Sequence, residues 1–83
     1  MKNKMTITEK IKSRIAVLRD IDKEKIFTFS HLENDLNLDS LDTVEFAYYL
    51  EREFNIEINE FDIKRLFTVL DVIQYIKGEL YGI

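Results

Sequence analysis

The 83-residue sequence contains no cysteine and no proline, and its only two glycines, Gly78 and Gly82, lie near the C-terminus. Without cysteine, the chain can form no disulfide framework, supply no thiolate nucleophile and bind no metal through sulfur. The absence of proline, of repeats and of low-complexity stretches gives no sign of a linker between domains. We therefore expect a single domain over residues 1–83.

Long apolar runs are also missing from the sequence. No stretch is long enough to cross a bilayer, so we expect no stable membrane insertion. The N-terminal segment, residues 1–6, is basic but lacks the apolar stretch of a signal peptide. A cytoplasmic monomer is the simplest interpretation. A domain of this size buries a modest core and is marginal for the deep pocket of an enzyme.

The net charge of −4 is unevenly divided along the chain. Residues 1–29 carry eight Lys or Arg and four acids, whereas residues 30–83 carry four Lys or Arg and twelve acids. An acidic surface repels the phosphates of nucleic acid, so nucleic acid is not an expected partner of the second part. Opposite fields speed encounter, and we therefore expect partners with basic patches.

The spacing of apolar residues predicts an all-α bundle of three longer helices and one short helix. We expect these helices over about 8–18, 40–54, 60–65 and 69–80. Residues 19–39 are less regular, with helical turns expected near 23–26 and 31–35. The first helix has an apolar stripe at steps of four, four and three, formed by Ile7, Ile11, Ile15 and Leu18. Thr6 and Glu9 are predicted to form a capping box at its start.

The helix predicted at 40–54 begins after Asp39, a good N-cap residue, with Asp42 three positions later. One side is apolar, and its predicted inward stripe is Leu41, Val44, Ala47, Leu50 and Phe54, flanked by Phe46 and Tyr48. The other side is mostly charged, and its predicted outward residues are Asp42, Glu45, Glu51, Arg52 and Glu53. Most aromatic side chains are expected in the core, namely Phe27, Phe29, Phe46, Tyr48, Phe54, Phe61 and Phe67.

Ser40 lies where the loop pattern becomes the helix pattern. Serine is common at helix starts, and the string Asp-Ser-Leu-Asp also occurs by chance, so alone it favours an ordinary cap region. The preceding residues add information, because Asn37 tolerates the left-handed backbone of a tight turn. A phosphodiester on Ser40 would meet the free amides of the helix N-terminus, while Asp39 and Asp42 would oppose its charge.

The segment 39–45, Asp-Ser-Leu-Asp-Thr-Val-Glu, resembles the attachment motif of acyl carrier proteins. The resemblance runs without gaps from about Ile7 to Gly78. It implies that a phosphopantetheinyl transferase moves 4′-phosphopantetheine from coenzyme A onto Ser40, which is flanked by Asp39, Leu41 and Asp42. It also implies that the thiol of this arm carries acyl intermediates of fatty acid, polyketide or related biosynthesis, and that the acyl chain can tuck between the helices.

The resemblance further implies that the second long helix is the main docking face. We expect an acyltransferase, ketosynthase or acyl ligase with a basic patch to contact Asp39, Asp42, Glu45, Tyr48, Glu51, Arg52 and Glu53. The sequence departs from the family pattern, with Asn37 in place of glycine, Asn59 in place of proline and Arg52 within an acidic run. Tyr48 and Phe67 are larger than usual and are predicted to fill the acyl groove. These departures indicate a specialised carrier.

Other functions are weaker interpretations of the same residues. One is a carrier of aminoacyl or peptidyl groups, and another is a helical adaptor without a prosthetic group. A Ser/His hydrolase would need His31 beside Ser40, but no oxyanion-hole pattern accompanies the pair. Asp35, Asp39 and Asp42 lack the spacing of an EF-hand loop. We therefore expect no catalytic residues and no metal site.

Overall fold

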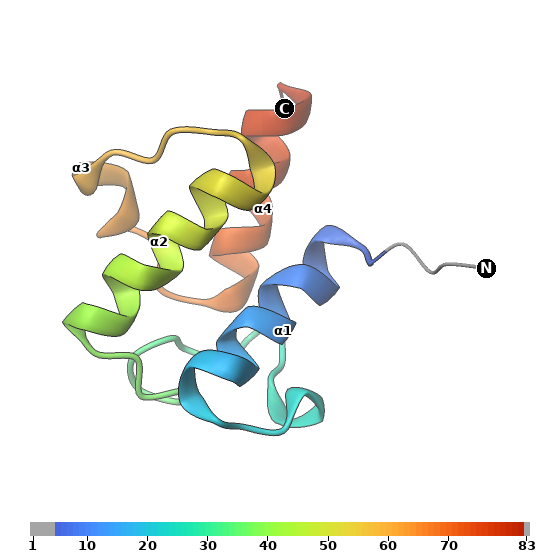
Figure 1. Ribbon diagram of the computed structural model, residues 1–83, viewed down its shortest axis with the longest axis vertical. Coiled ribbons are helices and arrows are strands. Elements are labelled where there is room, and N and C mark those ends of the chain that lie inside the picture. The colour runs from blue at the N-terminus through green and yellow to red at the C-terminus, as the bar shows by residue number, and fades with distance from the viewer. Residues whose placement is uncertain (1–4, 83) are drawn as a thin grey trace.

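The computed structural model describes residues 5–82, so residues 1–4 of the basic N-terminal segment and Ile83 lie outside the described part (Figure 1). The elements are α1 (Ile7–Arg19), the short 3₁₀ helix η1 (Lys23–Lys25), α2 (Ser40–Phe54), α3 (Glu60–Ile63) and α4 (Val69–Tyr81). Within residues 5–82 the only β-type pairing is one isolated bridge between His31 and Thr68. The predicted all-α bundle is confirmed. None of the described helices is long and apolar enough to span a membrane.

The three long helices begin with the same arrangement of hydrogen bonds. At α1, the Thr6 hydroxyl accepts from the Glu9 N–H, and the Glu9 carboxylate accepts from the Thr6 N–H, both at 3.1 Å. This is the capping box that the sequence predicted, and α2 and α4 have equivalent boxes. The boxes use backbone N–H groups that have no acceptor within the helix, so they fix where each helix begins.

The core lies between the three long helices and the loop that joins α1 to α2. The buried apolar side chains are Ile11, Ile15, Ile26, Leu36, Leu38, Phe46, Leu50, Phe54, Val69, Val72, Ile73 and Ile76. Three of them come from the loop, which closes the end of the bundle where α2 begins (Figure 1). The loop therefore takes part in the core and holds the start of α2 in place.

The inward stripe predicted for α2 is wrong at two positions. Leu41 and Val44 are 69% and 47% exposed, while Phe46 is only 1% exposed. Successive helical residues are separated by about 100° around the axis, which places positions 46, 50 and 54 on one side and positions 41, 44 and 48 on the other. The helix thus carries two apolar stripes, and the one with two phenylalanines, Phe46 and Phe54, packs into the core.

The prediction that most aromatic side chains are buried is also wrong. Phe46 and Phe54 are buried, but the other five predicted core aromatics, Phe27, Phe29, Tyr48, Phe61 and Phe67, are exposed. Aliphatic residues of the loop fill the space instead. The exposed rings are partly covered by other side chains: Phe27 and Phe29 stack with centroids 5.1 Å apart, and the Arg65 guanidinium lies 5.4 Å from the centre of the Phe61 ring.

The short helix α3 ends at Ile63, two residues earlier than predicted. The Arg65 N–H donates to the Asp62 carbonyl three residues back, so the chain tightens into a turn after Ile63. The Tyr75 hydroxyl donates to the Asp62 carboxylate at 3.0 Å and connects α4 to α3. Burial, with this hydrogen bond, raises the pKa of Tyr75 to about 12.

The lead-in to α2 is shaped by Asn37, which has the left-handed φ of 60° that its residue type permits. The residues on either side, Leu36 and Leu38, are both buried. The Leu38 N–H donates to the Leu32 carbonyl at 3.0 Å. This turn anchors the chain just before Asp39 and Ser40, as the sequence predicted.

Candidate functional site

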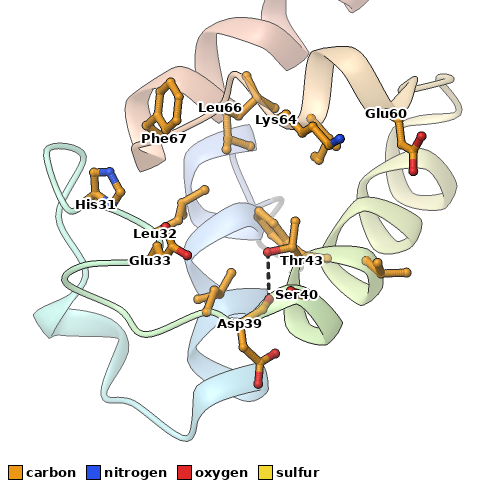
Figure 2. A pocket seen from close by; sticks show the side chains of 15 residues that line it. His31, Leu32, Glu33, Asp39, Ser40, Thr43, Glu60, Lys64, Leu66 and Phe67 are labelled. Atoms are coloured by element: carbon orange, nitrogen blue, oxygen red, sulfur yellow. Dashed lines mark hydrogen bonds between the residues drawn. The ribbon is translucent and has the colours of Figure 1, made fainter.

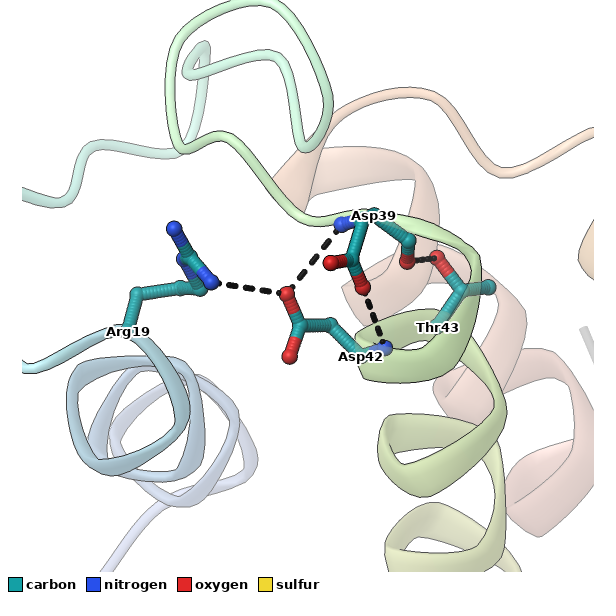
Figure 3. Close-up of polar contacts among 4 residues, drawn as sticks. All are labelled: Arg19, Asp39, Asp42 and Thr43. Carbon is teal, nitrogen blue, oxygen red and sulfur yellow. Dashed lines mark hydrogen bonds and ion pairs between the residues drawn. The ribbon is translucent and has the colours of Figure 1, made fainter.

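Ser40 is the first residue of α2 and is exposed. The Asp39 carboxylate accepts from the Asp42 N–H at 2.9 Å, and the Asp42 carboxylate accepts from the Asp39 N–H at 3.1 Å (Figure 3). The Thr43 hydroxyl donates to the Asp39 carbonyl at 2.9 Å. These bonds fix the backbone on both sides of Ser40, while no acceptor for the Ser40 N–H is found among residues 5–82.

Asp42 also connects the start of α2 to the end of α1. Its carboxylate accepts from the Arg19 guanidinium at 3.0 Å (Figure 3). The Asp42 side chain is 14% exposed and that of Arg19 is 34% exposed, so the pair is partly shielded from solvent. One carboxylate therefore serves both as a cap of α2 and as a link between two helices.

The Asp39 carboxylate lies at the surface beside Ser40. The pKa of Asp39 is lowered, chiefly by the hydrogen bond from the Asp42 N–H, with smaller contributions that include the positive charge of Arg19. Asp39 consequently stays ionised at neutral pH. A phosphodiester on Ser40 would meet the helix N-terminus, but it would also lie near this negative charge.

A cavity of about 370 Å³ opens next to Ser40, between α2, α3, the loop and the start of α4 (Figure 2). Its apolar lining includes Leu32, Leu38, Val44, Phe46, Ile63, Leu66, Phe67 and Val72. Polar side chains also line it, among them Ser40, Thr43, His31, Glu60 and Lys64. Because the exposed hydroxyl and the apolar lining adjoin each other, a group attached at Ser40 could reach an apolar space directly.

The two side chains predicted to fill this groove leave it open. Tyr48 does not line the cavity and is 63% exposed. Phe67 does line it, but its side chain is 55% exposed and lies against the His31 ring, with centroids 6.1 Å apart (Figure 2). The prediction that these aromatics occupy the interior is therefore wrong, and Phe67 shapes the edge instead.

His31 is engaged within its own turn. Its Nδ1 accepts from the Asn34 N–H at 3.0 Å, and its backbone N–H donates to the Asp35 carboxylate at 2.7 Å. No hydrogen bond joins His31 to Ser40 in the described part of the chain, so the geometry offers no Ser/His pair. Within residues 5–82, no three His, Asp or Glu side chains are grouped so that they could hold a metal ion.

The acids predicted for docking are in different situations. Glu53 pairs with Lys10 at 3.0 Å, and the Glu51 carboxylate accepts from the Ile58 N–H at 2.8 Å. Asp42 pairs with Arg19, as described above. By contrast, Glu45 has no ion pair within residues 5–82 and is exposed, as are Tyr48 and Arg52. Several acids of α2 are thus used inside the chain, which the sequence of α2 alone could not reveal.

Sequence reasoning missed Leu41 and Val44 as surface residues beside Ser40. They form an exposed apolar stripe with Tyr48, and α2 places the three residues on one side at steps of three and four. The signal was present in the sequence as a second set of apolar positions offset from Phe46, Leu50 and Phe54. Such a stripe on an exposed helix is typical of a surface that binds a partner.

Comparisons with known proteins agree with this arrangement. A family profile described as the phosphopantetheine attachment site matches residues 9–76. The acyl carrier protein of Thermosynechococcus vestitus (strain NIES-2133 / IAM M-273 / BP-1) is 38% identical over 78 residues, which cover 94% of this chain and 96% of that protein. The acyl carrier protein of Cyanidium caldarium is 37% identical over 76 residues, which cover 92% and 88% of the two chains.

A solved structure of the acyl carrier protein from Enterococcus faecalis, reported in work on its high thermal stability, superposes with a TM-score of 0.77 at 30% identity. The match covers 88% of this chain and 92% of that chain. Members of this family are carriers, not enzymes, and 4′-phosphopantetheine is their covalent cofactor. With a family profile over most of its length and relatives of similar size, the chain belongs to the acyl carrier protein family.

Proposed function

We propose that this chain carries acyl groups on a 4′-phosphopantetheine arm attached to the Ser40 hydroxyl, for fatty acid, polyketide or related biosynthesis. The observation that carries the proposal is the position of Ser40, an exposed first residue of α2 beside a cavity with an apolar lining. The neighbouring backbone is fixed by Asp39 and Asp42, so the hydroxyl is presented at a defined place.

Attachment is a phosphoryl-type transfer carried out by a separate phosphopantetheinyl transferase. The Ser40 oxygen bonds to the phosphorus that links phosphopantetheine to the nucleotide of coenzyme A, the hydroxyl proton is lost, and the adenosine bisphosphate leaves. The attached arm supplies a thiol that holds the acyl group as a thioester. This chain contributes an accessible hydroxyl at a helix N-terminus, where a phosphate charge is tolerated.

The cavity supports transient shelter of the acyl chain. Its apolar lining would remove part of a hydrocarbon chain from water, which is favourable by about 25 cal/mol per Å² of apolar surface. Its mouth includes Ser40 and the exposed edge of Phe67. An open cavity favours an acyl cargo over a polar aminoacyl cargo, because apolar walls offer little to a charged amine.

The exposed stripe of Leu41, Val44 and Tyr48 is the best candidate for the centre of the docking surface. Apolar contacts supply binding energy, while Asp39 and Glu45 beside the stripe supply charge that attracts a basic partner. Glu45→Lys should slow transferase action at low ionic strength, and added salt should reduce the difference because exposed charges are screened. The identity of the acyltransferase, ketosynthase or ligase stays a prediction, as do the cytoplasmic location and the monomeric state.

The test of the proposed function is intact-mass analysis after incubation with coenzyme A and a broad-specificity transferase. One phosphopantetheine should be added to the wild type and none to Ser40→Ala. Ser13→Ala is the matched control, because Ser13 lies within α1, away from the cavity residues, and that variant should be modified normally. An unmodified wild type would instead favour the adaptor interpretation, and modification of Ser40→Ala would place the attachment elsewhere.

A further inference from the structure

A shallow hollow lies on the outer side of α1 and α2, separate from the cavity beside Ser40. Its lining consists of Arg14, Glu45, Tyr48, Tyr49, Arg52 and Glu53. Two guanidinium groups, two phenol rings and two carboxylates thus line one surface depression. Tyr48 and Glu45 also belong to the proposed docking surface, so the hollow is continuous with it.

Arg14 is positioned by its contact with Tyr49. The Arg14 guanidinium lies 4.8 Å from the centre of the Tyr49 ring, a distance typical of a cation–π contact. Tyr49 is itself held, because its hydroxyl donates to the Lys10 carbonyl at 3.3 Å. The ring thus orients the guanidinium while the side chain of Arg14 remains exposed.

The charges around the hollow are not balanced within the chain. Glu53 is paired with Lys10 at 3.0 Å, which leaves its negative charge largely compensated. Arg14 and Arg52 are both exposed, and neither has a carboxylate within ion-pair distance in the described residues 5–82. The hollow therefore presents two positive groups with unused donors, whereas Glu45 presents a negative group nearer to Ser40.

We propose that the hollow receives an acidic side chain of the partner protein, so that the docking surface recognises charges of both signs. Guanidinium groups bind carboxylates in a planar, two-bonded geometry, which makes a Glu or Asp the fitting occupant. Glu45 and Arg52 are seven residues apart on α2, which corresponds to about 10 Å along the helix axis. The partner would therefore present a basic and an acidic residue about 10 Å apart, with the basic one nearer to Ser40. This inference rests on the proposed function, since it extends the docking surface of the carrier.

The test is an NMR titration of the full ¹⁵N-labelled chain with two synthetic helical peptides of equal length and apolar content. One peptide carries Lys and Glu seven residues apart, and the other carries Lys at both positions. The Lys/Glu peptide should bind more tightly and should shift the side-chain signals of Arg14 and Arg52. Arg14→Glu combined with Arg52→Glu should weaken its binding by roughly tenfold, as expected for two exposed charge contacts, and should leave the all-Lys peptide unweakened.

Arg65→Glu is the matched control, because Arg65 also lies over an exposed ring, that of Phe61, but neither residue lines the hollow. It should leave peptide affinity unchanged. The milder pair Arg14→Gln and Arg52→Gln keeps the test meaningful if the double reversal does not fold, and it should weaken binding by several-fold. Equal binding of the two peptides, or equal losses in the Arg65 control and the hollow variants, would overturn the proposal.

The outcome can be separated from that of the proposed function. Ser40→Ala should bind the Lys/Glu peptide as the wild type does, because the hollow does not include Ser40. A wild-type chain that accepts no phosphopantetheine but still prefers the Lys/Glu peptide would contradict the carrier role and leave the proposal for the hollow standing. A wild-type chain that is modified normally but binds the two peptides equally would support the carrier role and overturn the proposal for the hollow.

Discussion

The N-termini of α2 and α4 have the same capping hydrogen bonds, but the start of α4 is covered by the loop and the start of α2 is exposed. In α2 the cap is Asp39 with Asp42 three residues later, and in α4 it is Thr68 with Asp71. The reciprocal bonds are 2.9 and 3.1 Å long in α2 and 3.1 and 3.0 Å long in α4. The local chemistry of the two helix starts is therefore nearly the same.

What differs is the residue that follows the cap. In α4 it is Val69, which is 0% exposed and whose N–H donates to the Ser30 carbonyl at 3.1 Å. The Leu70 N–H donates to the Thr28 carbonyl at 2.9 Å, so the loop covers this helix start. In α2 the corresponding residue is Ser40, which is exposed. The comparison teaches that one capping device can either anchor a loop or present a hydroxyl, according to the side chain after the cap.

The largest expected effect on stability comes from replacing the first residue of each helix, Val69 in α4 or Ser40 in α2, by alanine. Val69→Ala should lower the free energy of unfolding by about 2 kcal/mol, because it removes two buried methyl groups and leaves a small cavity. Ser40→Ala should change it by less than about 0.5 kcal/mol, as expected for an exposed residue. Urea denaturation measures both. Similar losses in the two variants would mean that the two helix starts are not distinguished by burial.

Removing the caps should have a smaller and more equal effect. Thr68→Ala and Asp39→Ala should each destabilise the fold by about 1 kcal/mol, because each removes the side-chain acceptor of one N–H. Thr68→Ser and Asp39→Asn keep an acceptor and should retain most of the stability. If Asp39→Ala proved several times more damaging than Thr68→Ala, the cap of α2 would have a role beyond the one seen here.

Substitutions of the third residues of α2 and α4, Asp42 and Asp71, should lower the stability by amounts that depend differently on salt. Asp42 pairs with Arg19, whereas the Asp71 carboxylate accepts only from the Phe67 and Thr68 N–H groups in the described structure. Asp42→Asn should lower the free energy of unfolding. The part of this loss that is due to the ion pair should be at most about 1 kcal/mol and should become smaller with added salt. The Asp71→Asn loss should depend less on salt. Denaturation at low and high ionic strength compares them, and identical salt dependence would show that the Arg19 pair adds nothing.

The smallest expected effect is on the dependence of stability on pH. The pKa of Asp39 is lowered below 3.8 in the folded state, chiefly by the Asp42 N–H bond. Its contribution is therefore fully present above the unfolded pKa and is lost as the pH falls through the folded pKa. A hydroxyl cap such as Thr68 does not titrate in this range. Asp39→Ser should flatten the stability profile slightly below about pH 4, and an unchanged acid slope would rule out Asp39 as a contributor.

Much of the fold could be predicted because its signals are local. The capping residues Thr6 and Asp39 and the left-handed Asn37 each depend on a few neighbouring atoms, and all three have the predicted geometry. The position of Ser40 at the start of α2 follows from the same signals. The short helix α3 was less predictable, because a residue distant in the sequence contacts it: the Tyr75 hydroxyl of α4 donates to the Asp62 carboxylate.

The face of α2 could not be predicted because two apolar stripes compete on it. Leu41 and Val44 have the right spacing for burial, but Phe46 fills the core better, and only the packing of α1 and α4 decides between them. The pairs Arg19–Asp42 and Lys10–Glu53 likewise arise from residues far apart in the sequence. Tertiary contacts therefore determine which acids remain available to a partner.

Within residues 5–82, three non-glycine residues have a positive φ: Asp20 at 54°, Asn37 at 60° and Asn55 at 55°. Glycine would adopt each conformation without strain, but it would also give the unfolded chain more conformations to lose on folding. The use of Asp and Asn instead of glycine at these turns thus stabilises this small protein partly by limiting the conformations of the unfolded chain. Replacing all three by glycine would relax the folded backbone and enlarge the unfolded ensemble together. A chain of this kind can keep sharp turns at the ends of its helices while retaining comparatively little freedom when it unfolds.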